Sequence, residues 1–138
     1  MEDLKEYDEL FFPFLEAGFV AINQADEDAA IKLFNGCRLL NGENSLIEIG
    51  IGYLHLHKLE LKKSIECFEN VLTKEPDNDM ARTFLGIAQA LTPDQVTKGE
   101  KVLMDAAKNA KDDEVKKVAD TTLDFVDQFV KQGGSSAG

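Results

Sequence analysis

The chain has 138 residues, of which 43% are hydrophobic and 30% are charged, a composition typical of a globular domain rather than of a disordered or membrane-embedded chain. Twenty-six acidic residues against fifteen basic ones give a formal net charge of −11. This negative field repels phosphate backbones and anionic lipids, which argues against a nucleic-acid partner and favours a basic or neutral one.

The first ten residues contain five acids and one base, Lys5, which is unlike the basic start and apolar run of a secretory signal. No apolar stretch approaches the roughly 20 residues that a membrane span requires. We therefore expect a cytoplasmic protein without a membrane span, whose residues 1–10 form a short acidic helix.

Helical spacing of apolar residues, with start signals such as Asp26 and stop signals such as Pro76, predicts seven further helices. In chain order their expected ranges are roughly 13–23, 26–40, 45–58 and 61–74, then a helix that starts near residue 78, and finally 94–111 and 113–132. Two helix starts are predicted only to within one position, with Asn44 or Ser45 as the cap of the third helix and Asp77 or Asn78 as the cap of the fifth. Residues 133–138 (GGSSAG) are expected to form a flexible tail.

A repeat of 34 residues runs through these helices. An apolar residue followed by glycine recurs at this offset, at Ala17-Gly18, Ile51-Gly52 and Leu85-Gly86. The same offset links Ala30 to Ser64 and Phe34 to Phe68. Small residues at these places let two helices approach closely, and the aromatic residues fill the space between successive helix pairs.

This pattern resembles the tetratricopeptide repeat (TPR). The resemblance implies an all-α fold, a right-handed superhelix of helix-turn-helix repeats at about 11–44, 45–78 and 79–112, closed by a capping helix at 113–132. Residues 1–132 would then form a single TPR domain. The third repeat is expected to be degenerate, because Lys98 and Val102 stand where the small residue and the aromatic residue should be.

In stacked TPRs the first helix of each repeat lines a concave groove, through repeat positions 2, 5, 9 and 12. With His57 at the groove edge, the resemblance implies partner-binding residues Phe12, Leu15, Phe19, Ile22, Leu46, Ile49, Tyr53, Leu56, His57, Met80 and Ile87. A second face of the same helices is expected to form the core, through Ala17, Val20, Ile51, Leu54, Leu85 and Ala88. An apolar stripe of this size is typical of a binding surface. There are three alternatives to a groove that is open to a partner. The stripe is buried in a homodimer, it is covered by the N-terminal segment, or the register is shifted by one residue.

The residues of this chain do not predict catalysis. His55 and His57 point about 200° apart on a helix and cannot share a metal. Cys37 and Cys67 lie on apolar helix faces, where buried reduced thiols are expected. No phosphate-binding loop or catalytic motif occurs in the sequence. We therefore expect a protein that is not an enzyme and that needs no cofactor and no metal.

Small acidic proteins of about three TPRs with an apolar groove resemble bacterial type III secretion chaperones, in particular those of needle subunits. The resemblance implies that the groove sequesters an amphipathic helix of a needle or translocator subunit before export. Two other functions remain open at this stage: an adaptor or scaffold that bridges subunits of an assembly, and a self-dimerising structural module.

Overall fold

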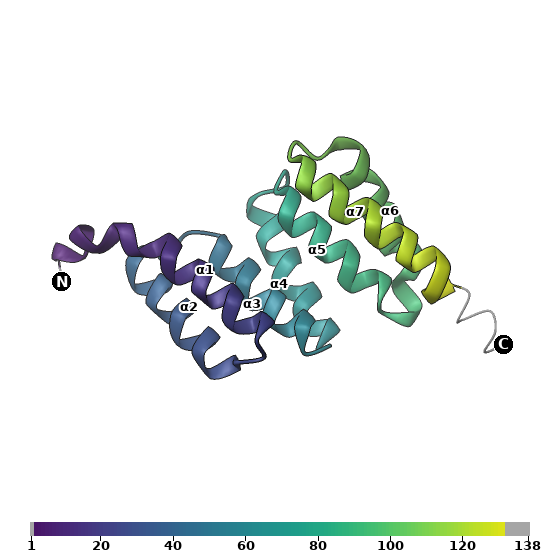
Figure 1. Cartoon of the computed structure of the whole chain (residues 1–138). Helices are drawn as coiled ribbons and strands as arrows, with labels where there is room; N and C mark the ends of the chain where they lie inside the picture. The colour runs from purple at the N-terminus through teal and green to yellow at the C-terminus, as the bar shows by residue number, and fades with distance from the viewer. Residues whose placement is uncertain (1, 132–138) are drawn as a thin grey trace. The chain divides into compact units, whose positions relative to one another are not determined.

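The computed structural model describes residues 2–131, with side chains from residue 5, and all its regular elements are helices (Figure 1). In chain order they are η1 (Glu2–Leu10), α1 (Phe11–Asn23), α2 (Glu27–Asn41), α3 (Leu46–His57), α4 (Leu61–Lys74), α5 (Asp79–Ala90), η2 (Pro93–Gln95), α6 (Val96–Asn109), α7 (Asp113–Phe125) and η3 (Val126–Lys131). The all-α prediction is confirmed for this part of the chain. The predicted tail at 133–138 lies outside the described residues.

The chain divides into two compact units, residues 1–67 and 68–138, with the boundary inside α4. In unit 1, α1 packs against α2 and both contact α3, while η1 leads into α1. In unit 2, α5 packs against α6, and α7 lies against both (Figure 1). The pairs α1/α2 and α5/α6 are the first and third helix pairs that the sequence predicts. The single domain, the repeat number and the superhelix stay predictions.

The helix starts follow the polar residues that the sequence provides. The side chains of Asp26 and Asn78 accept hydrogen bonds from the backbone N–H groups of Ala29 and Ala81, at 3.1 and 2.9 Å. These bonds satisfy amides that have no partner within the helix. At the start of α3 the N-cap position is Ser45, and the side chain of the preceding Asn44 accepts a hydrogen bond from the Leu46 amide at 2.9 Å. Both residues that the sequence allowed thus take part in starting this helix.

The turns that end α1 and α3 are built alike. Ala25 and Leu59, which are 34 residues apart, both adopt a left-handed backbone with φ of 60°. The amide that follows each of them bonds back to a carbonyl five residues earlier, from Asp26 to Ala21 and from Glu60 to His55, at 2.8 Å in both turns. This is the Schellman geometry, which usually takes glycine because a side chain at this φ is strained. The 34-residue repeat therefore extends to backbone conformation.

Phe34 occupies the centre of the unit 1 core and is fully buried. Two glycines make room for its ring. A Cβ atom would lie 2.6 Å from the ring if it were placed on Gly18 and 2.7 Å from it on Gly50. Phe19 meets the same ring edge to face, with ring centroids 5.8 Å apart. The prediction that glycine permits close helix packing is confirmed at Gly18.

Leu103 is fully buried in the core of unit 2, as Phe34 is in the core of unit 1. A Cβ atom on Gly86 would lie 2.8 Å from its side chain. At Gly99 the approach is backbone to backbone, since an added Cβ would lie 2.5 Å from the amide nitrogen of Ala90 and 2.7 Å from the carbonyl oxygen of Gly86. Helices α5 and α6 thus touch along a line that has no space for a side chain.

The expectation of a degenerate third repeat is therefore wrong in its register. The core positions are filled by Gly99 and Leu103, one residue later than the predicted Lys98 and Val102. Helices α2 and α4 begin 34 residues apart, at 27 and 61, whereas α6 begins at 96, 35 residues after α4. The 3-10 turn η2 takes up the extra residue, so a fixed offset points to the wrong side chains.

Candidate functional site

The predicted groove residues separate into two rows with different environments. Repeat positions 2 and 9 are exposed or half-buried in all three helices: Phe12, Phe19, Leu46, Tyr53, Met80 and Ile87. Positions 5 and 12 are buried at Leu15, Ile22, Ile49, Thr83 and Ala90, and Leu56 is half-buried. Residues seven apart lie on one stripe of a helix, two turns from each other, so each row shares one environment.

The prediction of a groove open along its whole width is consequently wrong for Leu15, Ile22 and Ile49. Leu15 and Ile22 belong to the core of unit 1, where α1 is covered by α2 on one side and by α3 on another. A helix with two packed neighbours buries a wider part of its circumference than a helix with one. Within unit 1 the open part of the predicted groove is thereby reduced to positions 2 and 9 of α1 and α3.

The opposite error affects two residues that were expected in the core. Val20 is 52% exposed and Ala17 is also exposed, whereas Leu54, Leu85 and Ala88 are buried as predicted. Elements η1, α2 and α3 are those that pack on α1 in the described chain, and they leave this side of α1 uncovered. Residues at equivalent positions of the repeat are therefore not equally buried.

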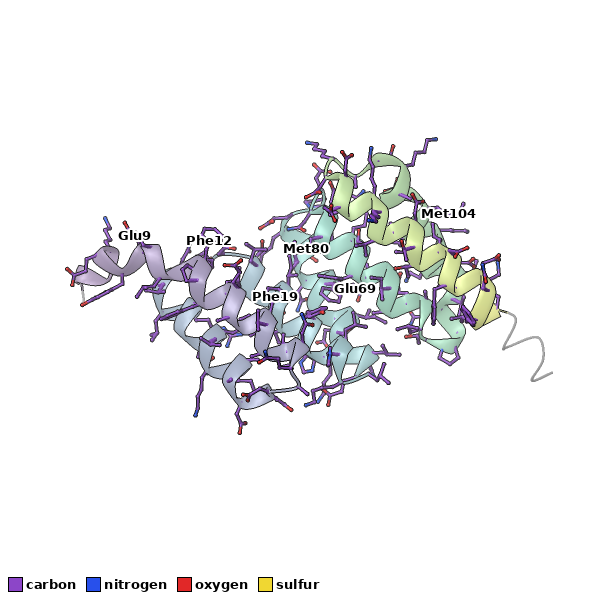
Figure 2. All side chains as sticks on the ribbon, in the orientation of Figure 1. Glu9, Phe12, Phe19, Glu69, Met80 and Met104 are labelled. Carbon is purple, nitrogen blue, oxygen red and sulfur yellow. The ribbon has the colours of Figure 1, made fainter. Side chains whose placement is uncertain are left out.

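In unit 1 the open row forms what we call the aromatic surface, made of Phe12, Phe19, Tyr53 and His57. The rings of Phe19 and Tyr53 lie 5.4 Å apart, and those of Tyr53 and His57 lie 6.3 Å apart. The Tyr53 hydroxyl donates a 2.7 Å hydrogen bond to Asn23 Oδ1, which ties α3 to the end of α1. Phe12 is 60% exposed at the other end of α1, and Figure 2 labels it together with Phe19.

Polar contacts stabilise the turn that follows α3, next to the aromatic surface. His55 makes a 2.8 Å contact from Nδ1 to Glu60 Oε1. Lys58 lies 2.8 Å from Glu27 and 3.5 Å from Glu60. The hydrogen bond from His55 lowers the pKa of the Glu60 carboxyl, and the charges of Lys58 and Lys63 act in the same direction. These contacts hold α3 against the start of α2 and so help to position Tyr53 and His57.

Unit 2 has a cleft of about 320 Å³ between α5 and α7. Its walls are mainly apolar and are formed by Ile87, Ala90, Leu91, Thr121, Thr122, Phe125 and Val126. Ile87, a predicted groove residue, thus lines an accessible recess. Phe125 at its edge was not predicted as a site residue. The packing of α7 on α5 and α6 alone places it there.

The apolar residues of the last helix, which was predicted at 113–132, are only partly buried. Ala119 and Val126 are buried, but Val118 is 42% and Phe129 is 65% exposed. From Val126 onward the helix widens into the π-helical segment η3, which has more residues per turn than an α-helix. Continuing the α-helical spacing past residue 125 therefore assigns Phe129 to the wrong face.

Both cysteines are buried free thiols, as predicted. Cys37 Sγ lies 3.6 Å from the carbonyl oxygen of Phe11, and burial raises the pKa of its thiol. Burial, reinforced by the nearby Glu48 carboxylate, raises the pKa of Cys67 to about 12 from an ordinary 9.0. A raised pKa means that the protonated thiol predominates at neutral pH, which makes both sulfurs poor nucleophiles.

This shift predicts a loss of stability in alkali. The folded protein keeps the Cys67 proton up to about pH 12, while the unfolded chain releases it near pH 9.0. The stabilisation is fully present below pH 9 and is lost as the pH rises toward 12, because the unfolded state then binds fewer protons. We expect the free energy of unfolding, measured with urea between pH 8 and 11, to fall more steeply for the natural protein than for Cys67→Ala. If the free energy of unfolding fell equally steeply with pH in the two proteins, the raised pKa of Cys67 would be contradicted.

Within residues 2–131 no group of three metal-binding side chains comes together, and no helix is long and apolar enough to cross a membrane. What the described chain offers is an exposed aromatic row in unit 1 and an apolar cleft in unit 2. Exposed apolar surfaces and apolar clefts are places where proteins typically bind other molecules.

These observations define an all-helical, repeat-like protein. No protein-family profile matches the chain, and no solved structure matches it. A segment of 74 residues, 53% of this chain, is 31% identical to the RNA polymerase-associated protein CTR9 of Caenorhabditis elegans. The chain covers 6% of the length of that protein, so the similarity concerns one segment of it. The match fits a fold of the TPR type and suggests a role in protein interaction.

Proposed function

We propose that this protein is a TPR-type binding module that holds a helical segment of another polypeptide on its aromatic surface, and that it is not an enzyme. The observation that carries the proposal is the exposure of Phe12, at 60%, next to the partly exposed rings of Phe19 and Tyr53. The similarity to a segment of CTR9, a TPR-containing protein, supports it.

The shape of the surface favours an amphipathic helix as the bound segment. Phe12 and Phe19 are seven residues apart on α1, two turns of one stripe, and Tyr53 extends this row onto α3. A helix that presents apolar side chains at spacings of three, four and seven residues matches a row of this kind. Aromatic side chains are also the residues that contribute most at interfaces.

Substituting Phe12 with alanine tests the proposal. We expect Phe12→Ala to weaken binding of an amphipathic helical peptide by roughly tenfold, the effect of losing about 1.4 kcal/mol at an interface anchor. Stability should stay nearly unchanged, because the side chain is mostly exposed. Binding is measured by fluorescence anisotropy with a labelled peptide.

Leu39→Ala is the matched control. Leu39 is 71% exposed on α2, outside the aromatic surface, so its loss should change neither binding nor stability. In a nitrogen-15 NMR titration the peptide should shift amide signals of α1 and α3. Equal weakening by both substitutions, or shifts confined to α2, would contradict the assignment of the surface.

Two narrower hypotheses come from the sequence resemblance and stay predictions. One is that the bound helix belongs to a needle or translocator subunit and is sequestered until export. The other is that the protein bridges subunits of an assembly. Self-association is a third possibility, and light scattering on the isolated protein over a concentration series tests it. A dimer that persists on dilution would mean that the apolar surface is covered by a second copy.

A further inference from the structure

The face of unit 1 that carries Phe12 is acidic as well as apolar. Between residues 2 and 23 the sequence has one base, Lys5, against the acids Glu2, Asp3, Glu6, Asp8, Glu9 and Glu16. Glu6, Asp8, Glu9 and Glu16 are exposed. Six acids against one base give these 22 residues a net charge of −5, nearly half of the −11 of the whole chain.

Two of these acids flank the aromatic surface itself. Glu9 precedes Phe12 by three residues, and Glu16 follows it by four, so both carboxylates lie about one helical turn from the Phe12 ring. Figure 2 shows Glu9 and Phe12 along the same edge of the η1–α1 segment. Glu16 stands between Phe12 and Phe19 along α1. An apolar anchor seated on this row would therefore have a carboxylate on either side of Phe12.

These acids outnumber the bases near them in the sequence, because Lys5 is the one base between residues 2 and 23. Lys58, which follows α3, is engaged by Glu27 and Glu60 at 2.8 and 3.5 Å. From Glu6 to Ile31 the chain has no lysine or arginine at all. A second copy of this protein would bring a surface of the same sign, and like charges placed across an interface disfavour it.

We propose that the segment bound on the aromatic surface is a basic amphipathic helix, with apolar anchors over Phe12 and Phe19 and lysine or arginine side chains beside Glu9 and Glu16. This rests on the proposed function and adds the charge of the partner. Complementary charge raises the association rate and selects among helices with the same apolar pattern.

Three labelled helical peptides test the proposed preference for a basic helix. They share the same leucine positions and differ in the polar residues next to the leucines, which are lysine in one peptide, glutamine in the second and glutamate in the third. The lysine peptide should bind about tenfold more tightly than the glutamate peptide at low salt, and this preference should shrink at high salt. The variant Glu9→Lys/Glu16→Lys should remove or reverse the preference. The control Glu43→Lys/Glu66→Lys makes the same change in net charge at exposed residues of the α2–α3 turn and of α4. This control should keep most of the preference for the lysine peptide.

The outcomes separate the two proposals. If all three peptides bind equally and Phe12→Ala weakens each of them, the charge inference is overturned while the proposed function stands. If none binds, both are overturned. If the control variant removes the preference as fully as the Glu9 and Glu16 variant, the selectivity comes from net charge and the assignment to this surface fails.

Discussion

Replacing Phe34 with alanine is expected to lower the free energy of unfolding by about 3 to 5 kcal/mol, the range measured for removing a buried aromatic side chain. Phe34 is fully buried, and its ring fills the space that Gly18 and Gly50 leave open. Neither glycine has a side chain that could move into the resulting cavity, so relaxation is limited. Since small domains are stable by roughly 5 to 15 kcal/mol, this loss is a large fraction of the total stability.

Urea denaturation followed by far-UV circular dichroism measures this effect. Leu39→Ala is again the control, because Leu39 lies on the same helix, α2, and is 71% exposed. It should change stability by no more than about 0.5 kcal/mol. A similar loss in both variants would mean that Phe34 is not the centre of the core and would contradict the packing described for unit 1.

The second large effect is expected at Gly99. Introducing valine there places a Cβ atom about 2.5 Å from the Ala90 nitrogen, a contact that helix α5 can relieve only by moving its backbone. Overpacking of this kind costs typically 1 to 3 kcal/mol, and we expect Gly99→Val to lie at or above about 3 kcal/mol because no flexible side chain can give way. Thermal unfolding should show a lower midpoint.

Lys98→Val introduces the same side chain one residue earlier and provides the comparison. Lys98 is exposed, so the substitution should alter stability by less than about 1 kcal/mol. The pair also tests the register of α6. If Lys98→Val were the more damaging variant, the 34-residue offset would hold through the third helix pair and the core position assigned to Gly99 would be wrong.

Much of the secondary structure was predictable because its causes are local. Asp26, Asn78 and Asp112 cap the helices that they precede, and α4 has the predicted bounds Leu61–Lys74. The acid clusters at 26–28 and 112–114 lie at helix starts, as expected from the helix dipole. Each of these features depends on a few consecutive residues, which a sequence displays directly.

The candidate site was predictable only in part. The sequence shows which helix faces are apolar, including Phe12, Phe19 and Tyr53, and which acids lie beside them. Tertiary packing selects the faces that remain open, since α1 is covered by α2 and α3 at Leu15 and Ile22 but not at Val20. Packing also places Gly99 in the core, through one extra residue ahead of α6, and leaves Phe129 of η3 exposed. Apolar character is a property of one side chain, whereas burial depends on which neighbours pack against it, and those neighbours come from distant parts of the chain.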